Sequence, residues 1–453
     1  MAKPSKNLKL LSVDDALAVA RVEPSALFER FARMHSAELA DLLLACKDDS
    51  QRRELIRCMP DALLGDTLLE LPEGMQEDLL ADFKAHQIVG FVEHLNSDDA
   101  ADILQVVEKE VADEVIEGLE PDERREIEPL MEHGEETAGG LMQVELFKVR
   151  DDWKVKKVLR VLRRWSKNIE NLNYVYIVDD EDRLVGMLSL HSLLFVEPDV
   201  LVMDIAETAL RSVLPEQDQE DVIKVFKKYD ILALPVLDKE GVLLGRITAD
   251  DVIDVIQEEA TEDMYRLAAV SDQDDLAEPV GITAWRRGVW LGVNLATAIL
   301  ASIVISQFEA TISQIVALAI LMPIVASMGG IAGTQTLTVI VRGIALGRVT
   351  YNNARRALIK ETSVGLLTGL TFALLVGIVV SFWFPQFGVS LGLVIGAAML
   401  INLCAAGLAG ALIPLTLQRL KIDPALASGT ILTTVTDVVG FLSFLGLATH
   451  FLL

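Results

Sequence analysis

Residues 431–453, ILTTVTDVVGFLSFLGLATHFLL, form an apolar run that a single acid, Asp437, interrupts. A membrane-spanning helix needs about 20 apolar residues, and this run meets that length. Asp437 lies 13 residues past Pro424, about 20 Å along a helix and well inside a hydrocarbon core about 30 Å thick. A carboxylate at that depth is costly unless it faces a bundle interior or a water-filled path. The run therefore predicts a membrane helix that carries a cation-binding acid.

The helix face that carries Asp437 also carries Thr433 one turn earlier and Gly429 two turns earlier. A carboxylate, a hydroxyl and accessible backbone suit a hard, hydrated dication such as Mg²⁺, which prefers oxygen ligands and keeps several waters. The alternative is a protonated Asp437 that donates a structural hydrogen bond to a neighbouring helix.

Five membrane spans are predicted, at residues 284–306, 312–341, 358–383, 389–415 and 425–451. The second span contains Pro323 and the segment MGGIAGTQT, so we expect it to be tilted or broken. Small and polar residues gather there, namely Gly329, Gly330, Gly333, Gln335, Thr336 and Thr338. They either line a pore or allow close helix packing.

Lys and Arg residues place the soluble part inside the cell. They lie before the first span, between the second and third, and between the fourth and fifth, whereas the loops SQFEATIS and WFPQFGVS carry none. Because cytoplasmic loops are enriched in basic residues, we expect a cytoplasmic N-terminal part, an outside C-terminus, and a location in the inner or plasma membrane. The N-terminus shows no secretory signal, and three unpaired cysteines fit a reducing compartment.

The charge of the chain also changes at the boundary between the soluble part and the membrane spans. The first 281 residues hold 31 Lys and Arg against 63 Asp and Glu, and the remainder holds nine against four. A strongly acidic soluble part argues against nucleic acid as a partner and fits cations better.

An internal repeat occupies the N-terminal region. LPEGMQEDLL, LNSDDAADIL and LEPDERREIE begin at Leu71, Leu95 and Leu119, 24 residues apart, and SAELADLLL at Ser36 is interpreted as an earlier, looser copy. Each unit begins with a capping residue and continues with apolar residues at helical spacing, which is typical of a short helix pair. Stacked pairs predict a small all-α solenoid.

A second duplication follows between about 143 and 262. YVYIVDDEDRLVGMLSLHSLL (174–194) and LPVLDKEGVLLGRITADDVI (234–253) align, with Gly186 matching Gly245 and helices beginning at Ser189 and Thr248. This strand–turn–strand–helix pattern resembles a tandem of cystathionine-β-synthase-type (CBS) domains, which usually sense a ligand. The alternative is a duplicated structural unit without a ligand.

Acids recur where a helix should avoid them. Asp250, Asp254, Glu258 and Glu262 follow one another at i, i+4, and Asp98 and Asp102 repeat the spacing in the solenoid. Like charges at this spacing destabilise a helix unless a divalent cation bridges them. We interpret the cluster as regulatory cation sites, the alternative being a solvated acidic surface.

Over nearly its whole length the chain resembles the MgtE-type magnesium transporter family. The motifs that carry the resemblance are EETAGGLM (135–142), EATEDMYRLAAV (259–270), and KIDPALASG followed by TDVVGF in the last span. The resemblance implies an acidic helical repeat domain (1–142), CBS domains (143–201 and 202–262), a connecting or plug helix (263–283) and a five-helix transmembrane domain (284–453).

The family resemblance further implies a homodimer in the bilayer whose pore lies at the two-fold interface, with Asp437 as pore carboxylate. Mg²⁺ bound between the cytosolic domains and the plug helix would stabilise a closed state. By position, the implied regulatory acids are Asp98, Asp102, Asp218, Glu220, Asp230, Asp251, Asp254, Glu259, Glu262, Asp263 and, at the membrane face, Asp423.

The chain departs from the family pattern at three places. The family's GGNxGNQ reads GGIAGTQ here, with Ile331 and Thr334 in place of asparagines, and Gly429-Thr430 follows DPALAS where Asn/Gly-Pro is common. These changes leave Asp437 in place but weaken strict Mg²⁺ selectivity, so Co²⁺ or another dication could pass. In the CBS pair, Thr248 and Asp251 fit a T-x-x-D pattern that can hold the ribose of a nucleotide such as ATP. The first copy has Ser189 and Ser192 instead.

The sequence therefore predicts a Mg²⁺-selective channel or transporter for divalent cation influx that is gated by cytosolic Mg²⁺. It is not an enzyme of the ATPase kind, because no P-loop is present. Two alternatives stay open: a membrane-anchored Mg²⁺ sensor, and an exporter of Mg²⁺ or Co²⁺ coupled to Na⁺ or H⁺.

Overall fold

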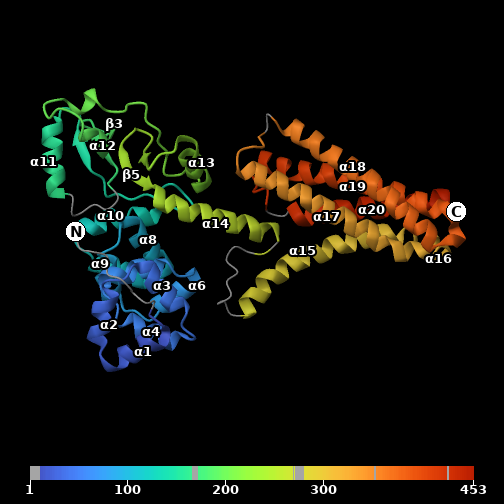
Figure 1. The fold of residues 1–453 in the computed structure, drawn as a ribbon, viewed down its shortest axis with the longest axis horizontal. Helices are drawn as coiled ribbons and strands as arrows, with labels where there is room; N and C mark the ends of the chain where they lie inside the picture. Colours follow the sequence, from blue (N-terminus) through green and yellow to red (C-terminus); the bar gives the residue numbers. More distant parts are fainter. Residues whose placement is uncertain (1–10, 166–171, 269, 271–279, 351–352, 426–427) are drawn as a thin grey trace. The chain divides into compact units, whose positions relative to one another are not determined.

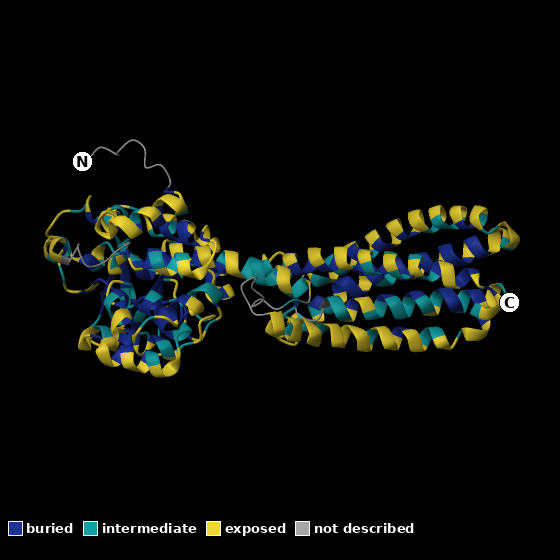
Figure 2. Ribbon diagram, turned by 90° about the horizontal axis from the view of Figure 1, so that it is seen from below, coloured by how far each residue is buried: buried dark blue, intermediate teal, exposed yellow. Residues whose placement is uncertain are grey.

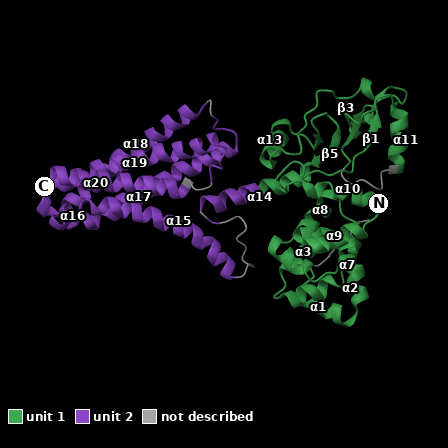
Figure 3. Cartoon of the chain, turned by 180° about the vertical axis from the view of Figure 1, so that it is seen from behind, with its two compact units in different colours: residues 1–257 green, residues 258–453 purple. Residues whose placement is uncertain are grey.

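The chain folds into two compact units, residues 1–257 and 258–453 (Figures 1 and 3). The computed structural model describes residues 11–165, 172–268, 270, 280–350, 353–425 and 428–453. The first unit holds a helical repeat followed by strands mixed with helices, and the second holds five long apolar helices. This architecture matches the predicted fold class.

After α1 (Val13–Val22), the N-terminal helices come in pairs that recur about every 24 residues. The pairs are α2 (Pro24–Phe31) with α3 (Ser36–Leu44), α4 (Asp49–Ile56) with α5 (Asp61–Leu69), α6 (Glu73–Leu80) with α7 (Ala85–Val92), α8 (Ser97–Val106) with α9 (Lys109–Gly118), and α10 (Pro121–Ile127) with the 3-10 turn η1 (Leu130–Glu132). Ser36 therefore begins the second helix of a pair rather than a copy of its own. SAELADLLL was interpreted as the start of a repeat, although it forms the second helix of one, because both helices of a pair bury the same kind of apolar face.

The same core position is filled in every repeat. Phe31, Leu55, Leu79, Ile103 and Ile127 are 24 residues apart, and each is at most 5% exposed. A repeat of this kind cannot bury its apolar face alone, so stacking extends one continuous core through neighbouring pairs. The strict spacing of these residues explains why the period was visible in the sequence.

Two strand–turn–strand–helix units complete the first unit. In the first, β1 (Lys148–Arg150), β2 (Tyr174–Val178) and β3 (Leu184–Ser189) form one sheet with α11 (Val155–Trp165) and α12 (Leu190–Leu193). In the second, α13 (Gln219–Tyr229) precedes the hairpin of β4 (Ala233–Leu237) and β5 (Leu243–Thr248), which α14 (Ala249–Leu267) follows. Gly186 pairs with Ile177 as Gly245 pairs with Val236, so the two copies share one register.

The acidic turns of the two hairpins fold alike. Asp179 Oδ1 accepts hydrogen bonds from the backbone N–H of Glu181 and Arg183, and Asp238 Oδ1 accepts from Glu240 and Val242. An Asp side chain that caps the backbone two residues ahead is a common way to close a turn. These acids therefore shape the turns.

Five helices of the second unit are long and apolar enough to cross a membrane: α15 (Val280–Ser306), α17 (Ala317–Ala345), α18 (Ala354–Trp383), α19 (Gly388–Arg419) and α20 (Ser428–Phe451). A short helix, α16 (Glu309–Gln314), and a 3-10 turn, η3 (Pro385–Phe387), lie in the two connections without basic residues. Much of the apolar surface of these helices is exposed, most of all on α15 (Figure 2), as expected for contact with lipid.

Pro323 lies inside α17, which is one continuous helix. The expected interruption of the span at residues 312–341 does not lie at this proline. The interruption falls earlier, at Ile315 and Val316, between α16 and α17. Pro323 removes one backbone donor near the start of the helix, which the long apolar segment that follows tolerates.

Candidate functional site

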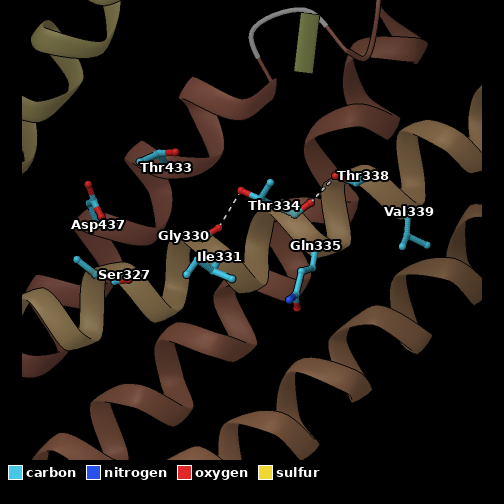
Figure 4. A pocket seen from close by; sticks show the side chains of 10 residues that line it. Ser327, Gly330, Ile331, Thr334, Gln335, Thr338, Val339, Thr433 and Asp437 are labelled. Carbon is cyan, nitrogen blue, oxygen red and sulfur yellow. Dashed lines mark hydrogen bonds between the residues drawn. The ribbon is translucent and has the colours of Figure 1, made fainter. Parts of the chain in front are cut away.

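A groove of about 780 Å³ lies between α17 and α20 (Figure 4). Its lining residues are Ala326, Ser327, Gly330, Ile331, Thr334, Gln335, Thr338 and Val339 from α17 with Thr433 and Asp437 from α20. Among these described residues Asp437 is the one ionisable side chain. The groove thus joins the predicted pore acid to the glycine-rich segment of the second span.

The hydroxyl groups in the groove can receive hydrogen bonds from a hydrated ion. Thr334, Thr338 and Thr433 each donate to a carbonyl one turn earlier in their own helix, at 2.9 to 3.0 Å. A hydroxyl that has donated its proton keeps lone pairs that can accept from water. Together with the Asp437 carboxylate they place oxygen atoms, the ligands that Mg²⁺ prefers, in a groove whose surface is otherwise mostly apolar.

Asp437 has no hydrogen bond or ion pair within the part of the chain that the structure describes. The alternative role for it, a structural hydrogen bond to a neighbouring helix, is absent from those residues. Gly429, the third predicted pore residue, does not line the groove, and a Cβ added there would lie 3.6 Å from the carbonyl of Leu267.

The small and polar residues of α17 divide between two faces. Gly330, Gln335 and Thr338 line the groove. The other three are packed inside the bundle: Gly329 against Asn402, Gly333 against Leu432, and Thr336 with its hydroxyl 3.5 Å from Glu361 Oε2. Close packing thus accounts for Gly329, Gly333 and Thr336, whereas pore lining stays a prediction for the three residues that line the groove.

A second group of acids lies in the first unit, where the start of α8 meets the start of α14. Asp98 is 5% exposed, and its Oδ1 has no hydrogen-bond partner among the described residues. Gln143 donates to Asp251 Oδ2 at 3.4 Å, and the Gln143 side chain also lies close enough to Asp98 to offset part of the rise in the pKa of that carboxyl. Asp98, Asp99 and Asp251, which we call the acidic cluster, thus approach one another around one amide side chain.

Burial and mutual repulsion make this acidic cluster hard to ionise. Desolvation, followed by the charges of Asp99 and Asp251, raises the pKa of Asp98 well above its usual range. Desolvation and the charge of Asp251 raise the pKa of Asp99 to about 7, and desolvation raises the pKa of Asp251. A bound cation would favour the ionised form of these carboxyl groups, and the gain is largest where burial and repulsion have raised the pKa.

Three acids close enough to hold one metal directly are not found among the described residues. The acidic cluster therefore suits an ion held through its waters, which is how Mg²⁺ is commonly bound. Asp99 was absent from the predicted set, although the DD pair at the start of LNSDDAADIL was a visible signal. Asp102, which was predicted, is exposed on the next turn and acts on Asp99 through its charge.

Three predicted acids of the second CBS-like unit have local roles. Asp218 caps α13 by accepting from the backbone N–H of Glu220. Glu220 forms an ion pair with Lys224 at 3.0 Å. Asp230 ends the same helix in a left-handed conformation, with φ at 50°. The structure does not bring these acids together with the acidic cluster.

The acids near the membrane surround an arginine. Arg266, in the last turn of α14, forms ion pairs with Glu262 and with Asp423. Leu267, the next residue, packs against Leu337 and Leu432 at the base of the bundle. The predicted set contained Glu262 and Asp423 as metal ligands, and here both are engaged by a cation of the chain itself. Asp254 is exposed on α14, and Glu259 and Asp263 are half-buried.

In each CBS-like unit, the candidate nucleotide residues form hydrogen bonds with each other at the start of a helix. Thr248 precedes the helix, and its N–H and hydroxyl both donate to Asp251 Oδ2, at 3.2 and 2.6 Å. In the first copy, Ser192 donates its N–H to Ser189 Oγ at 3.2 Å. Both pairs therefore act as helix caps.

An apolar five-helix domain with a groove that holds one acid and several hydroxyl groups, attached to an acidic soluble part, is typical of a multi-pass membrane transport protein for cations. Known proteins identify the family. A family model described as a divalent cation transporter matches residues 322–447, the MgtE intracellular N domain matches 34–136, and CBS domains match 138–199 and 202–258.

The magnesium transporter MgtE of Thermus thermophilus is 36% identical over 450 residues, which cover 97% of this chain and 98% of that protein. The magnesium transporter MgtE of Enterococcus faecalis is 38% identical over 331 residues, 73% of this chain and 72% of that protein. The chain belongs to the MgtE family of magnesium transporters, and it is accordingly a transport protein and not an enzyme.

A solved structure supports the fold of the soluble part. The crystal structure of the cytosolic domain of the Mg²⁺ channel MgtE in complex with ATP is 34% identical, with a TM-score of 0.51, and the match covers 54% of this chain and 99% of that one. The predicted helical domain and CBS pair are thereby confirmed.

Proposed function

We propose that this chain forms a Mg²⁺-selective channel that admits divalent cations into the cell and that closes when Mg²⁺ binds to its cytosolic part. The observation that carries the proposal is the groove between α17 and α20, where Asp437 lies among hydroxyl groups in an apolar helix bundle. A carboxylate retained at that depth is explained by an ion path.

The groove argues for a homodimer. One chain supplies two of its walls and a single carboxylate, whereas a dication is neutralised by two. Two-fold symmetry would place a second copy of the same groove opposite the first and so provide a second Asp437. The pore would then lie between the two chains, each of which spans the inner or plasma membrane with its N-terminal part inside and its C-terminus outside.

The acidic cluster is the proposed sensor. Asp98 and Asp99 of the helical domain lie close to Asp251 of the second CBS domain, and their charges repel one another. A hydrated Mg²⁺ would replace that repulsion by attraction and favour the packed arrangement, and a ligand that binds one state better shifts the population toward it. Low internal Mg²⁺ would release the two domains and open the path.

ATP is proposed as a second ligand of the CBS pair, through Thr248 and Asp251. The related cytosolic domain was solved in complex with ATP, which supports ATP as the ligand. A ribose would add to a Thr248–Asp251 pair that is already ordered by its cap. Calorimetric titration of ATP into the protein and into Asp251→Asn tests it, and unchanged affinity in the variant would exclude the assigned residues.

The decisive experiment is Mg²⁺ influx into proteoliposomes by the full-length protein and by Asp437→Ala. We expect the variant to abolish influx while remaining a folded dimer. Glu309→Ala is the matched control, because Glu309 is an acid of the same unit that lies outside the groove. Influx that persists in Asp437→Ala would remove the groove from the ion path. A wild-type protein that passes no Mg²⁺ would favour the sensor instead.

A further inference from the structure

Asn402 is a polar side chain inside the membrane bundle that does not line the groove. It lies near the middle of α19 and is 0% exposed. The described lining residues of the groove all come from α17 and α20. Polar residues are costly at this depth and are usually retained for a purpose.

One hydrogen bond fixes the orientation of the amide. Asn402 Nδ2 donates to the backbone carbonyl of Val325 on α17, at 2.9 Å. A carbonyl can only accept, so the nitrogen of the amide must face Val325. The Oδ1 atom is then buried without a hydrogen-bond partner in the described part of the chain. A leucine would fill a similar space without this unsatisfied acceptor, so packing alone does not explain the asparagine.

The amide group of Asn402 packs against a glycine on each of the two neighbouring helices. A Cβ added to Gly329 on α17 would overlap the amide group, and a Cβ added to Gly440 on α20 would lie 2.7 Å from Nδ2. Small residues let helices approach closely. The Asn402 side chain is therefore held in a slot that requires glycine on each side.

This slot adjoins both walls of the groove. On α17, Val325 and Gly329 are followed directly by Ala326 and Gly330, which line the groove. On α20, Gly440 lies one turn beyond Asp437. The volume of the Asn402 side chain therefore acts on the spacing of the two walls, and the helices can relax toward the space that a smaller side chain leaves.

We propose that Asn402 is a positioning residue that fixes the spacing of α17 and α20 and thereby sets which dication the groove accepts. The inference rests on the proposed transport function. Mg²⁺ gives up its waters reluctantly, so the groove must match the hydrated ion in width. A groove of altered width loses that match, and a dication that dehydrates more easily, such as Mn²⁺, then competes.

The test measures influx of Mg²⁺ and Mn²⁺ in competition, using the full-length protein in proteoliposomes. For Asn402→Ala we expect the Mg²⁺:Mn²⁺ flux ratio to fall by up to about a hundredfold, the loss that a misplacement of about 1 Å can cause in a preorganised site. Ser381→Ala is the matched control, because Ser381 also packs its polar group against a glycine of α19, Gly392, but contacts neither wall of the groove.

A double variant that moves side-chain volume from Asn402 to Gly329 distinguishes a positioning role of Asn402 from a general loss of stability. Gly329→Ala alone should disturb the ratio because its methyl group meets the amide, whereas Asn402→Ala combined with Gly329→Ala should restore it, since the methyl group then occupies the vacated space. An unchanged ratio in Asn402→Ala, or no recovery in the double variant, would overturn the inference while leaving Mg²⁺ transport intact. A wild-type protein without Mg²⁺ influx would instead refute the transport proposal.

Discussion

Arg266 Nη1 donates a hydrogen bond to Asp423 Oδ2 at 2.5 Å, which ties the last turn of α14 to the connection that precedes α20. The contact holds α14 against the base of the bundle, where Leu267 also packs. If this packed arrangement is the closed state, its loss should open the path. The two side chains are 27% and 31% exposed, so solvent weakens the pair.

We therefore predict that Arg266→Gln leaks Mg²⁺ at an internal Mg²⁺ concentration that closes the wild-type protein. A partly exposed pair is worth about 1 kcal/mol, which corresponds to roughly fivefold more residual flux. Flux into proteoliposomes loaded with Mg²⁺ measures it. Arg266→Lys should retain closure in part, and Asp423→Asn should reproduce the leak without adding to it in the double variant. Independent, additive effects would show that the pair does not act as a unit.

The acidic cluster predicts an unusual dependence of stability on pH. The pKa of Asp99 is raised to about 7 in the folded protein, whereas an unfolded Asp titrates near 4. The folded state thus binds more protons between these values, and the free energy of unfolding must fall as pH rises through this window. The slope is at most about 1.4 kcal/mol per pH unit for one group.

Urea unfolding of a soluble fragment of residues 1–267 between pH 5 and pH 7.5 measures this slope. Asp99→Asn should flatten it, while Asp113→Asn, at an exposed acid of α9, should leave it unchanged. Saturating Mg²⁺ should also flatten it, because the ion replaces the protons. A slope that Mg²⁺ does not affect would separate the acidic cluster from cation sensing.

The tandem hairpins give a matched pair of glycine variants. A Cβ at Gly245 would lie 2.8 Å from the backbone carbonyl of Gln143, whereas a Cβ at Gly186 would lie 3.0 Å from the methyl group of Ala206. We predict that Gly245→Ala costs about 1–3 kcal/mol, because a hydrogen-bonded backbone segment has to move. Gly186→Ala should cost less in the same urea titration, and equal costs would show that the two copies adapt equally well.

The repeating features of the fold could be predicted from the sequence. The 24-residue period was readable because one core position, from Phe31 to Ile127, is apolar in every repeat. The register of the hairpins was readable because Gly186 and Gly245 stand at equivalent places. Periodic burial produces a regular pattern of apolar residues along the sequence, so it can be predicted without knowing which distant segments are in contact.

Contacts between distant segments could not be predicted in this way. Arg266 meets Asp423 across 157 residues, and Asn402 meets Val325 across 77. Neither residue stands out locally, since an arginine in an acidic helix is ordinary and a single asparagine in an apolar run has no pattern. The division of α17 between groove and packing faces was also hidden, because glycines and threonines occur on both sides.

The homodimeric pore makes a quantitative prediction for mixtures of subunits. If each ion path is built from two Asp437 side chains, one Asp437→Ala subunit disables a whole dimer, and flux follows the square of the wild-type fraction. An equal mixture, unfolded to monomers and refolded together, should then retain about one quarter of the wild-type flux, against about one half if every chain carries its own path. Glu309→Ala subunits mixed in the same way should leave flux unchanged. A linear decrease with the fraction of Asp437→Ala would place a complete path within each chain.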